Sequence, residues 1–156
     1  MKTIILYATK YGAAAEISQR IAGRISGAVV CNLKEKDIPS LSDFDCIIIG
    51  SSVYAGNIRK EAKTFLQQNA NVLSEKKLGL FLCGLDKSSK NKYFEANFPQ
   101  DILQAAKEKS FLGGIFDPKK TKLMERFIIK IITKQSGYFN IINDKKIEKF
   151  AEAMKV

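Results

Sequence analysis

Short apolar runs that alternate with helical patterns constrain the fold of this chain more than any other feature. The clearest runs cover residues 3–8, 45–50 and 78–84, and each is almost uninterrupted by polar side chains. Continuous apolar runs of this length are typical of strands that are buried on both faces of a parallel sheet. Shorter runs at 28–33 and 111–116 add two further strands, so we predict five strands in all.

Between these runs, apolar residues recur three or four positions apart, which is the spacing of an amphipathic helix. The first helix is expected to end at Gly27, with inward-facing residues Ala14, Ile17, Ile21 and Ile25. Further helices are expected from about residue 59, from Pro99 to Ala106, over 121–134 and over 144–154. Parallel strands joined by helices require right-handed crossovers, and a length of 156 residues suits one domain. We therefore predict a single α/β domain spanning residues 1–156, with helices on both faces of a doubly wound sheet.

The composition excludes several kinds of chemistry. The sequence has no histidine, which excludes His-based triads and the usual zinc sites, so any redox chemistry must come from a cofactor. The three cysteines lie far apart in apolar runs, which predicts buried thiols in a reducing compartment rather than disulfides. No apolar run approaches the roughly 20 residues needed to cross a bilayer, and the N-terminus carries no signal-peptide core. We therefore expect a cytoplasmic protein.

The charge of the chain is strongly positive. The sequence carries 26 Lys and Arg against 16 Asp and Glu, a net charge of +10. Such a charge fits nucleic acid, an anionic membrane surface or an acidic protein as partner, and it also fits a lysine-rich surface without a partner. The basic residues do not alternate with a row of aromatic ones, and no nucleic-acid-binding motif occurs, so we expect no nucleic-acid partner. The charge alone leaves the other interpretations open.

In a doubly wound sheet, ligands bind beyond the carboxyl ends of the strands, where the strand order reverses. The loops expected there cover residues 9–14, 51–57 and 84–94. The first loop leads straight into a helix, whose free N–H groups favour an anion such as a phosphate. It has neither the dinucleotide fingerprint nor the P-loop pattern, which indicates a mononucleotide rather than NAD or ATP. In the second loop, Tyr54 is placed either to stack on a planar ring or to cap the sheet, and Gly56 would let the backbone approach such a ring.

Several segments taken together resemble a known family. They are Thr9-Lys10-Tyr11-Gly12, residues 47–56, residues 82–85 and Gly113-Gly114. In these segments the chain resembles the flavodoxin-domain proteins, and specifically their menaquinone-dependent protoporphyrinogen oxidase branch. The resemblance covers nearly the whole chain, including a basic helical insertion at about 119–136 and the ending at 142–151. It implies a flavodoxin-like five-stranded parallel sheet in the order 2-1-3-4-5, and FMN as the cofactor.

The resemblance also implies where FMN binds. The phosphate would lie against the first loop and the ring between the other two, close to the backbone of Gly56. The implied cofactor-binding residues are Thr9, Lys10, Tyr11, Gly12, Ala13, Ala14, Ser51, Ser52, Val53, Tyr54, Ala55, Gly56, Cys83, Gly84, Leu85 and Asp86. The family pattern carries several Ser or Thr hydroxyls in the phosphate loop, whereas only Thr9 remains here. Because each neutral hydrogen bond contributes about 0.5–1.5 kcal/mol, we expect FMN to bind one or two orders of magnitude more weakly than is usual in the family.

The insertion contains an apolar stripe at helical spacing within residues 119–134. Its apolar members are Leu123, Met124, Phe127, Ile128, Ile131 and Ile132, and its flanking cations are Lys119, Lys120, Lys122, Arg126, Lys130 and Lys134. This pattern fits a helix that lies on an anionic membrane surface, where a quinone would be reached. It fits equally an ordinary helix packed against the edge of the sheet.

Three functions remain open at this point. The first is an FMN-dependent oxidoreductase that passes electrons from a flat, porphyrinogen-like substrate to a quinone, peripheral on the inner face of the cell membrane. The second is a flavodoxin-type electron carrier for redox partner proteins, which the basic charge disfavours because flavodoxin carriers are acidic as a family. The third is a scaffold with weak or no FMN binding. No side chain is assigned a catalytic role, because Asp86 and Asp117 are expected to be solvated or helix-capping carboxylates.

Overall fold

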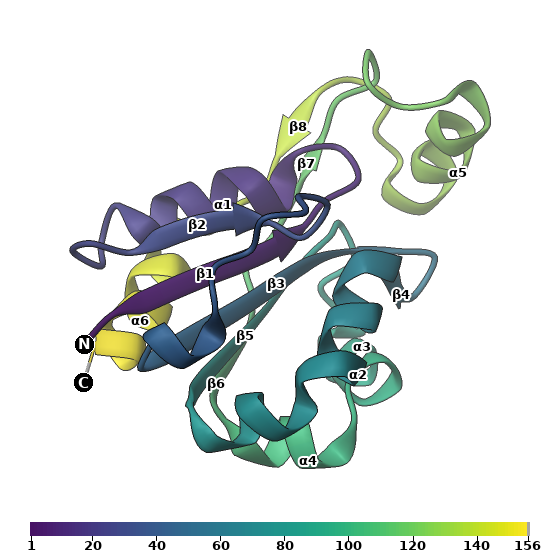
Figure 1. The fold of residues 1–156 in the computed structure, drawn as a ribbon. Helices are drawn as coiled ribbons and strands as arrows, with labels where there is room; N and C mark the ends of the chain where they lie inside the picture. Colours follow the sequence, from purple (N-terminus) through teal and green to yellow (C-terminus); the bar gives the residue numbers. More distant parts are fainter. Residues whose placement is uncertain (156) are drawn as a thin grey trace.

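The computed structural model describes residues 1–155, and within them five parallel strands form the central sheet (Figure 1). In chain order they are β1 (Thr3–Ala8), β2 (Val29–Asn32), β3 (Cys46–Tyr54), β5 (Lys77–Cys83) and β6 (Ala106–Phe111). Their order across the sheet is β2-β1-β3-β5-β6, and neighbouring strands run parallel. The predicted order is therefore confirmed, and the strand order reverses between β1 and β3.

Helices cover both faces of this sheet, as predicted (Figure 1). On one face lie α1 (Ala13–Ala22) and α6 (Asp144–Lys155), and on the other lie α2 (Lys60–Glu75), α3 (Lys90–Asn97) and α4 (Gln100–Ala105). A short 3-10 helix, η1 (Leu41–Asp43), precedes β3. Successive residues of a strand point to opposite faces of the sheet. Ile4 and Leu6 pack on the face covered by α2, and Ile5 packs on the face covered by α1 and α6. Because both layers bury their side of the sheet, the central strands are apolar at nearly every position.

The buried residues agree with two further predictions. The inward face of the last helix is fully buried and consists of Ile147, Phe150, Ala151 and Met154. The rings of Phe150 and Phe81 meet edge to face with centroids 6.3 Å apart, which joins α6 to β5. Cys31, Cys46 and Cys83 are buried free thiols, as expected.

The insertion rises from the end of the sheet at which the parallel strands terminate (Figure 1). Its base is a two-stranded antiparallel ribbon of β7 (Ile115–Phe116) and β8 (Phe139–Asn140), in which Phe116 and Phe139 pair with ring centroids 5.3 Å apart. Between them in the chain lies α5 (Leu123–Thr133). Among residues 1–155, no helix is both long and apolar enough to cross a membrane.

Two predicted elements after Pro99 are wrong. The fifth strand of the sheet is β6 at Ala106–Phe111 rather than residues 111–116, and α4 ends at Ala105, so that Ala106 lies in a strand instead of a helix. β6 is an edge strand, and Lys107 and Lys109 in the middle of this strand are exposed to solvent. An edge strand therefore carries polar residues and gives no continuous apolar run.

The predicted loops also contain more regular structure than expected. β3 continues through Tyr54 and turns back into β4 (Asn57–Ile58), which pairs antiparallel with β3, so residues 51–57 form a hairpin rather than an open loop. α3 occupies part of the loop expected at 84–94, and its sequence has little helical periodicity because few of its residues are buried. α1 ends at Ala22 rather than near Gly27.

Candidate functional site

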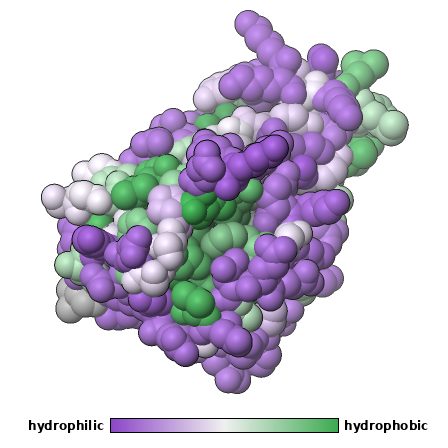
Figure 2. Space-filling model, viewed as in Figure 1, coloured by the Kyte–Doolittle hydropathy of each residue, from purple (hydrophilic) through white to green (hydrophobic). Residues whose placement is uncertain are grey.

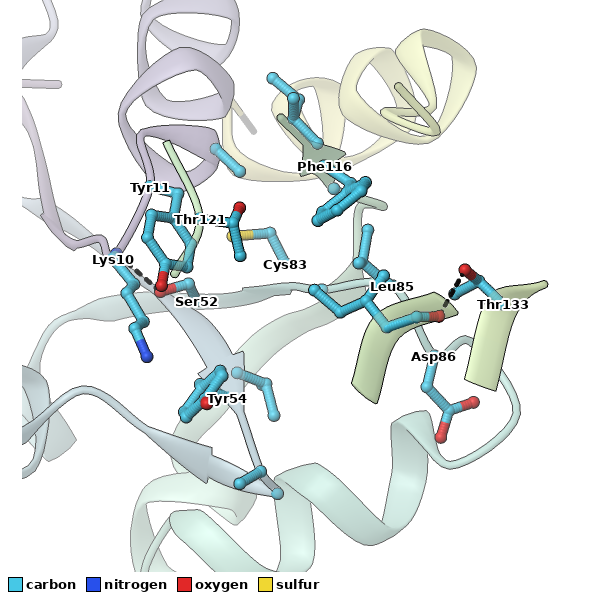
Figure 3. Close-up of a pocket in the computed structure, with 18 of the residues that line it drawn as sticks. Lys10, Tyr11, Ser52, Tyr54, Cys83, Leu85, Asp86, Phe116, Thr121 and Thr133 are labelled. Atoms are coloured by element: carbon cyan, nitrogen blue, oxygen red, sulfur yellow. Dashed lines mark hydrogen bonds between the residues drawn. The ribbon is translucent and has the colours of Figure 1, made fainter. Parts of the chain in front are cut away.

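A cavity of about 300 Å³ lies beyond the carboxyl ends of β1, β3 and β5, next to the start of α1 and beneath α5 (Figure 3). Most of the predicted site residues line it: Lys10, Tyr11, Ala13, Ser52, Val53, Tyr54, Ala55, Gly56, Cys83, Gly84, Leu85 and Asp86. The structure thus brings together residues from three loops that are far apart in the sequence. Thr9, Gly12, Ala14 and Ser51, which were also predicted, are not part of the lining.

The loop before α1 is held in shape by its own hydrogen bonds. The Thr9 hydroxyl accepts a hydrogen bond from the Gly12 N–H at 2.9 Å, and the Lys10 N–H donates to the Ser52 hydroxyl at 3.1 Å. Gly12 has φ 98°, a left-handed conformation that glycine adopts without strain, and α1 begins at the next residue. The first N–H groups of α1 have no partner within the helix, so they can hold an anion.

Ser51 serves the framework of the site. It is buried, its hydroxyl accepts a hydrogen bond from the Arg59 N–H at 2.9 Å, and it donates to the Ser52 carbonyl at 3.0 Å. These bonds fix the end of β3 against the start of α2. Ser51 therefore supports the hairpin that carries Tyr54 instead of facing the cavity.

The hairpin after β3 is a tight two-residue turn. Ala55 and Gly56 have φ 48° and 78°, and positive φ at both central positions matches the turn that suits the twist of a hairpin. The buried side chain of Asn97 in α3 donates to the Gly56 carbonyl at 2.8 Å and accepts from the Ile58 N–H at 3.0 Å. The Gly56 backbone is thus fixed from outside the hairpin, by a residue that the sequence analysis did not single out.

Tyr93 is a further aromatic residue of the cavity lining, and it was not predicted from the sequence. Tyr93 of α3 stacks on Phe111 with ring centroids 6.4 Å apart, and its hydroxyl donates to the Asp86 carboxylate at 2.8 Å. Hydrogen bonds from Ser88 and from Tyr93 lower the pKa of Asp86 to about 2. The pKa of Tyr93 is raised, mainly by burial and secondly by its hydrogen bond to Asp86. Asp86 is therefore a stable anion and a weak base at neutral pH.

The thiol of Cys83, which lines the cavity, is unreactive. Cys83 is fully buried, and burial raises its pKa to about 12. The thiol stays protonated at neutral pH, and a protonated thiol is neither a nucleophile nor a good metal ligand.

An ion pair joins the first loop to the insertion. The Lys10 Nζ lies 2.6 Å from the Glu125 carboxylate of α5, and the Tyr11 hydroxyl donates to the other oxygen of the same carboxylate. The Lys10 ammonium also stands 3.2 Å from the centroid of the Tyr54 ring (Figure 3). Glu125 was not predicted as a site residue, although it is the one acidic residue within residues 119–134. That isolated charge in a basic, apolar segment was the available signal.

The remaining lining residues were not predicted to bind a ligand, although Tyr93 lies in the loop expected at 84–94. They are Tyr93, Phe111, Gly114, Ile115, Phe116, Thr121, Ile128, Ile129 and Thr133. All of them except Tyr93 and Phe111 lie within residues 114–133, which include β7 and α5. The insertion therefore forms one side of the cavity, which its sequence pattern did not indicate.

The outer face of α5 points into solvent. Leu123, Met124, Phe127 and Ile131 are exposed to 78%, 75%, 66% and 63% of their surface, and Ile128 to 46%. Figure 2 shows hydrophobic residues gathered at this end of the molecule, beside hydrophilic ones. The Ile132 side chain lies outside the described part of the structure. These exposed fractions contradict an ordinary helix that buries its stripe against the sheet edge.

Comparison with known proteins agrees with this architecture. Residues 4–140 match the family described as the flavodoxin domain. The chain belongs to the flavodoxin domain family. Among curated proteins, protoporphyrinogen IX dehydrogenase (quinone) of Escherichia coli is 22% identical over 147 residues, which cover 88% of this chain and 81% of that protein.

Solved structures of flavodoxin-like proteins share the fold. Flavodoxin 2 of Bacillus cereus has a TM-score of 0.61 at 20% identity, with 99% of this chain and 97% of that one covered. A flavoprotein of Lactobacillus acidophilus in complex with FMN has a TM-score of 0.51 at 18% identity, covering 72% and 90%. The flavodiiron core of a Synechocystis protein has a TM-score of 0.62 at 16% identity and covers 99% of this chain. This chain spans 34% of that longer protein.

Proposed function

We propose that this protein is an FMN-dependent oxidoreductase that passes electrons from a flat, reduced, porphyrinogen-like substrate to a quinone. The observation that carries the proposal is the cavity at the carboxyl ends of β1, β3 and β5, which adjoins the start of α1 and has Tyr54 and Tyr93 in its walls. Membership of the flavodoxin domain family supports FMN as its ligand. The likeness to the E. coli enzyme supports a quinone as acceptor.

The cavity suits a flat ring with a phosphate tail. Its walls are largely apolar and aromatic, and Gly56, Gly84 and Gly114 leave the backbone accessible. The free N–H groups at the start of α1 would hold the phosphate. The Lys10 ammonium is paired with Glu125, and the Thr9 hydroxyl accepts from the Gly12 N–H, so the phosphate would depend on the free Thr9 O–H donor and on backbone N–H groups. This supports the expectation of weaker FMN binding than is usual in the family.

FMN, when bound, would supply the electron-transfer chemistry, and the side chains around it would supply binding and orientation. The low pKa of Asp86 and the high pKa of Cys83 leave both groups in fixed protonation states at neutral pH. Neither is suited to accept or release a proton during turnover. α5, which lines one side of the cavity, would keep water away from the ring.

The outer face of α5 supports contact with an anionic membrane, from which a quinone would be reached on the inner face. Its exposed apolar residues lie beside the six cations of residues 119–134, and both features favour a helix lying in a lipid interface.

In a test with vesicles, the wild type is expected to sediment with anionic and not with neutral lipid. Phe127→Glu should abolish this binding, and Tyr138→Glu, a change at another exposed aromatic residue, should not. Equal binding of Phe127→Glu and wild type would refute the membrane contact.

An electron carrier remains the second candidate, because the chain matches nearly the whole of a Bacillus cereus flavodoxin in length and fold. Turnover of protoporphyrinogen with menaquinone would support the enzyme. Rapid, salt-sensitive reduction by a flavodoxin reductase without porphyrinogen turnover would establish the carrier instead.

The first experiment is a titration of the purified protein with FMN, followed by flavin fluorescence quenching. We expect saturable one-to-one binding, weakened about tenfold or more in Tyr54→Ala because aromatic stacking on a base-like ring contributes roughly 1–3 kcal/mol. Thr9→Ala should weaken binding less, through the shape of the loop. Tyr138→Ala serves as the control, since Tyr138 is exposed and not part of the cavity lining. An absence of binding at high micromolar FMN would refute the proposal and leave the scaffold.

A further inference from the structure

Glu125 differs from the other residues of α5 whose burial the structure describes. It is buried, with 8% of its surface exposed, although α5 presents most of its residues to solvent. Its carboxylate faces the first loop of the domain, where it accepts hydrogen bonds from the Lys10 ammonium at 2.6 Å and from the Tyr11 hydroxyl. A buried carboxylate with two donors from one loop is a specific contact between distant parts of the chain.

Lys10 is fixed at both ends. Its main-chain N–H is bonded to the Ser52 hydroxyl, and its ammonium lies between the Glu125 carboxylate and the face of the Tyr54 ring. Lys10 and Tyr11 both line the cavity. The contact with α5 is therefore made at the cavity wall, between the loop next to α1 and the hairpin after β3.

The other polar contacts of this segment are local. Arg126 donates to the Thr121 carbonyl, Thr121 to the Asp117 carbonyl and Thr133 to the Ile129 carbonyl. Among the described side chains of α5, Glu125 is the one whose hydrogen bonds reach beyond residues 117–135. Ile128 and Ile129 line the cavity itself.

We propose that Glu125 is a positioning residue that latches α5 over the cavity, so that a ligand in the cavity enters and leaves when the contact of Glu125 with Lys10 and Tyr11 opens. This proposal rests on the proposed function only in taking FMN as the ligand. Replacing Glu125 by glutamine removes the charge and leaves the Lys10 ammonium without its counter-charge, which weakens a charge-assisted contact about ten- to a hundredfold.

The first arm of the test uses the protein without flavin. Trypsin can cut α5 after the exposed residues Arg126 and Lys130, and it does so faster when the helix is released. Glu125→Gln is expected to raise the rate of cleavage there about tenfold. Asp144→Asn, which removes the ion pair with Arg20 at 3.0 Å between two residues that do not line the cavity, is the matched control and should stay within twofold of wild type. The charge-swapped variant Lys10→Glu with Glu125→Lys should regain most of the resistance.

The second arm measures how fast FMN leaves the loaded protein, from the rise of free-flavin fluorescence after dilution. Glu125→Gln is expected to release FMN about tenfold faster, and Asp144→Asn at the wild-type rate. Unchanged cleavage in Glu125→Gln would refute the latch. Faster cleavage with unchanged FMN release would refute its role in retaining the ligand. Failure of every variant to bind FMN would count against the proposed function, while the cleavage arm would still decide whether Glu125 holds α5.

Discussion

Gly114 marks a close approach of two backbone segments in the wall of the cavity. A Cβ atom at this position would stand 2.6 Å from the Gly84 carbonyl oxygen and 2.9 Å from its carbon. The neighbouring backbone is fixed, because the Gly84 N–H donates to the Gly113 carbonyl at 3.0 Å and the Ile141 N–H donates to the Gly114 carbonyl at 2.8 Å. Gly114 does not have a positive φ, so Gly114→Ala tests this steric contact without backbone strain.

The free energy of unfolding should fall markedly in Gly114→Ala. Overpacking in a closely packed region costs about 1–3 kcal/mol, and displacing the segments would also weaken one or two hydrogen bonds at about 1 kcal/mol each. The expected loss is therefore about 2–5 kcal/mol, a large part of the roughly 5–15 kcal/mol that stabilises an ordinary domain. Because Gly84 and Gly114 both line the cavity, FMN binding should weaken in the same variant.

Urea denaturation followed by far-UV circular dichroism measures this loss. Gly137→Ala is the matched control, since no atom lies within 4 Å of a Cβ at Gly137 and its φ is not positive. The control should stay within about 0.5 kcal/mol of wild type. A Gly114→Ala variant as stable as the control would show that the two segments separate easily, and the reasoning from close approach would be wrong.

Three further predictions concern protonation and backbone conformation. The folded-state pKa of Asp86 is about 2, below its ordinary 3.8, so its stabilising contribution is present above about pH 4 and is lost as the pH falls toward 2. Asp86→Asn should therefore be less stable than wild type in urea at pH 7, and the gap should close by pH 2; a gap independent of pH contradicts this. Burial raises the pKa of Cys31, Cys46 and Cys83, so a disulfide reagent at pH 8 should label these thiols only after unfolding, and rapid labelling of the native protein would count against it. Ala55→Gly should raise the free energy of unfolding by about 0.5–1 kcal/mol, because Ala55 has φ 48°, whereas Ala15→Gly inside α1 should lower it by a similar amount; the same sign for both would refute the argument.

Most of the fold could be predicted because its central strands are covered on both faces. β1, β3 and β5 are apolar at nearly every position and stand out in the sequence. β6 did not stand out, because an edge strand keeps polar residues such as Lys107 and Lys109. α3 was missed for a related reason, since only Phe94 and Asn97 of this helix are buried.

The candidate site could be predicted in part. Parallel strands end at one edge of a sheet, so the loops after β1, β3 and β5 had to meet, and most residues expected there line the cavity. Tyr93, Asn97 and Glu125 could not be found in this way. Each reaches the site from an element whose position depends on the packing of the whole chain.

By itself, the sequence determined the α/β class, four of the five strands of the main sheet and the edge of the sheet where a ligand would bind, because apolar periodicity and the carboxyl ends of parallel strands follow from short segments. Only the tertiary structure decided how α5 is used. An apolar stripe has the same spacing whether it faces a sheet or solvent, and the stripe of α5 faces solvent. The contact of Glu125 with Lys10 joins residues 115 positions apart, and a contact of that kind depends on the path of the chain rather than on any local pattern.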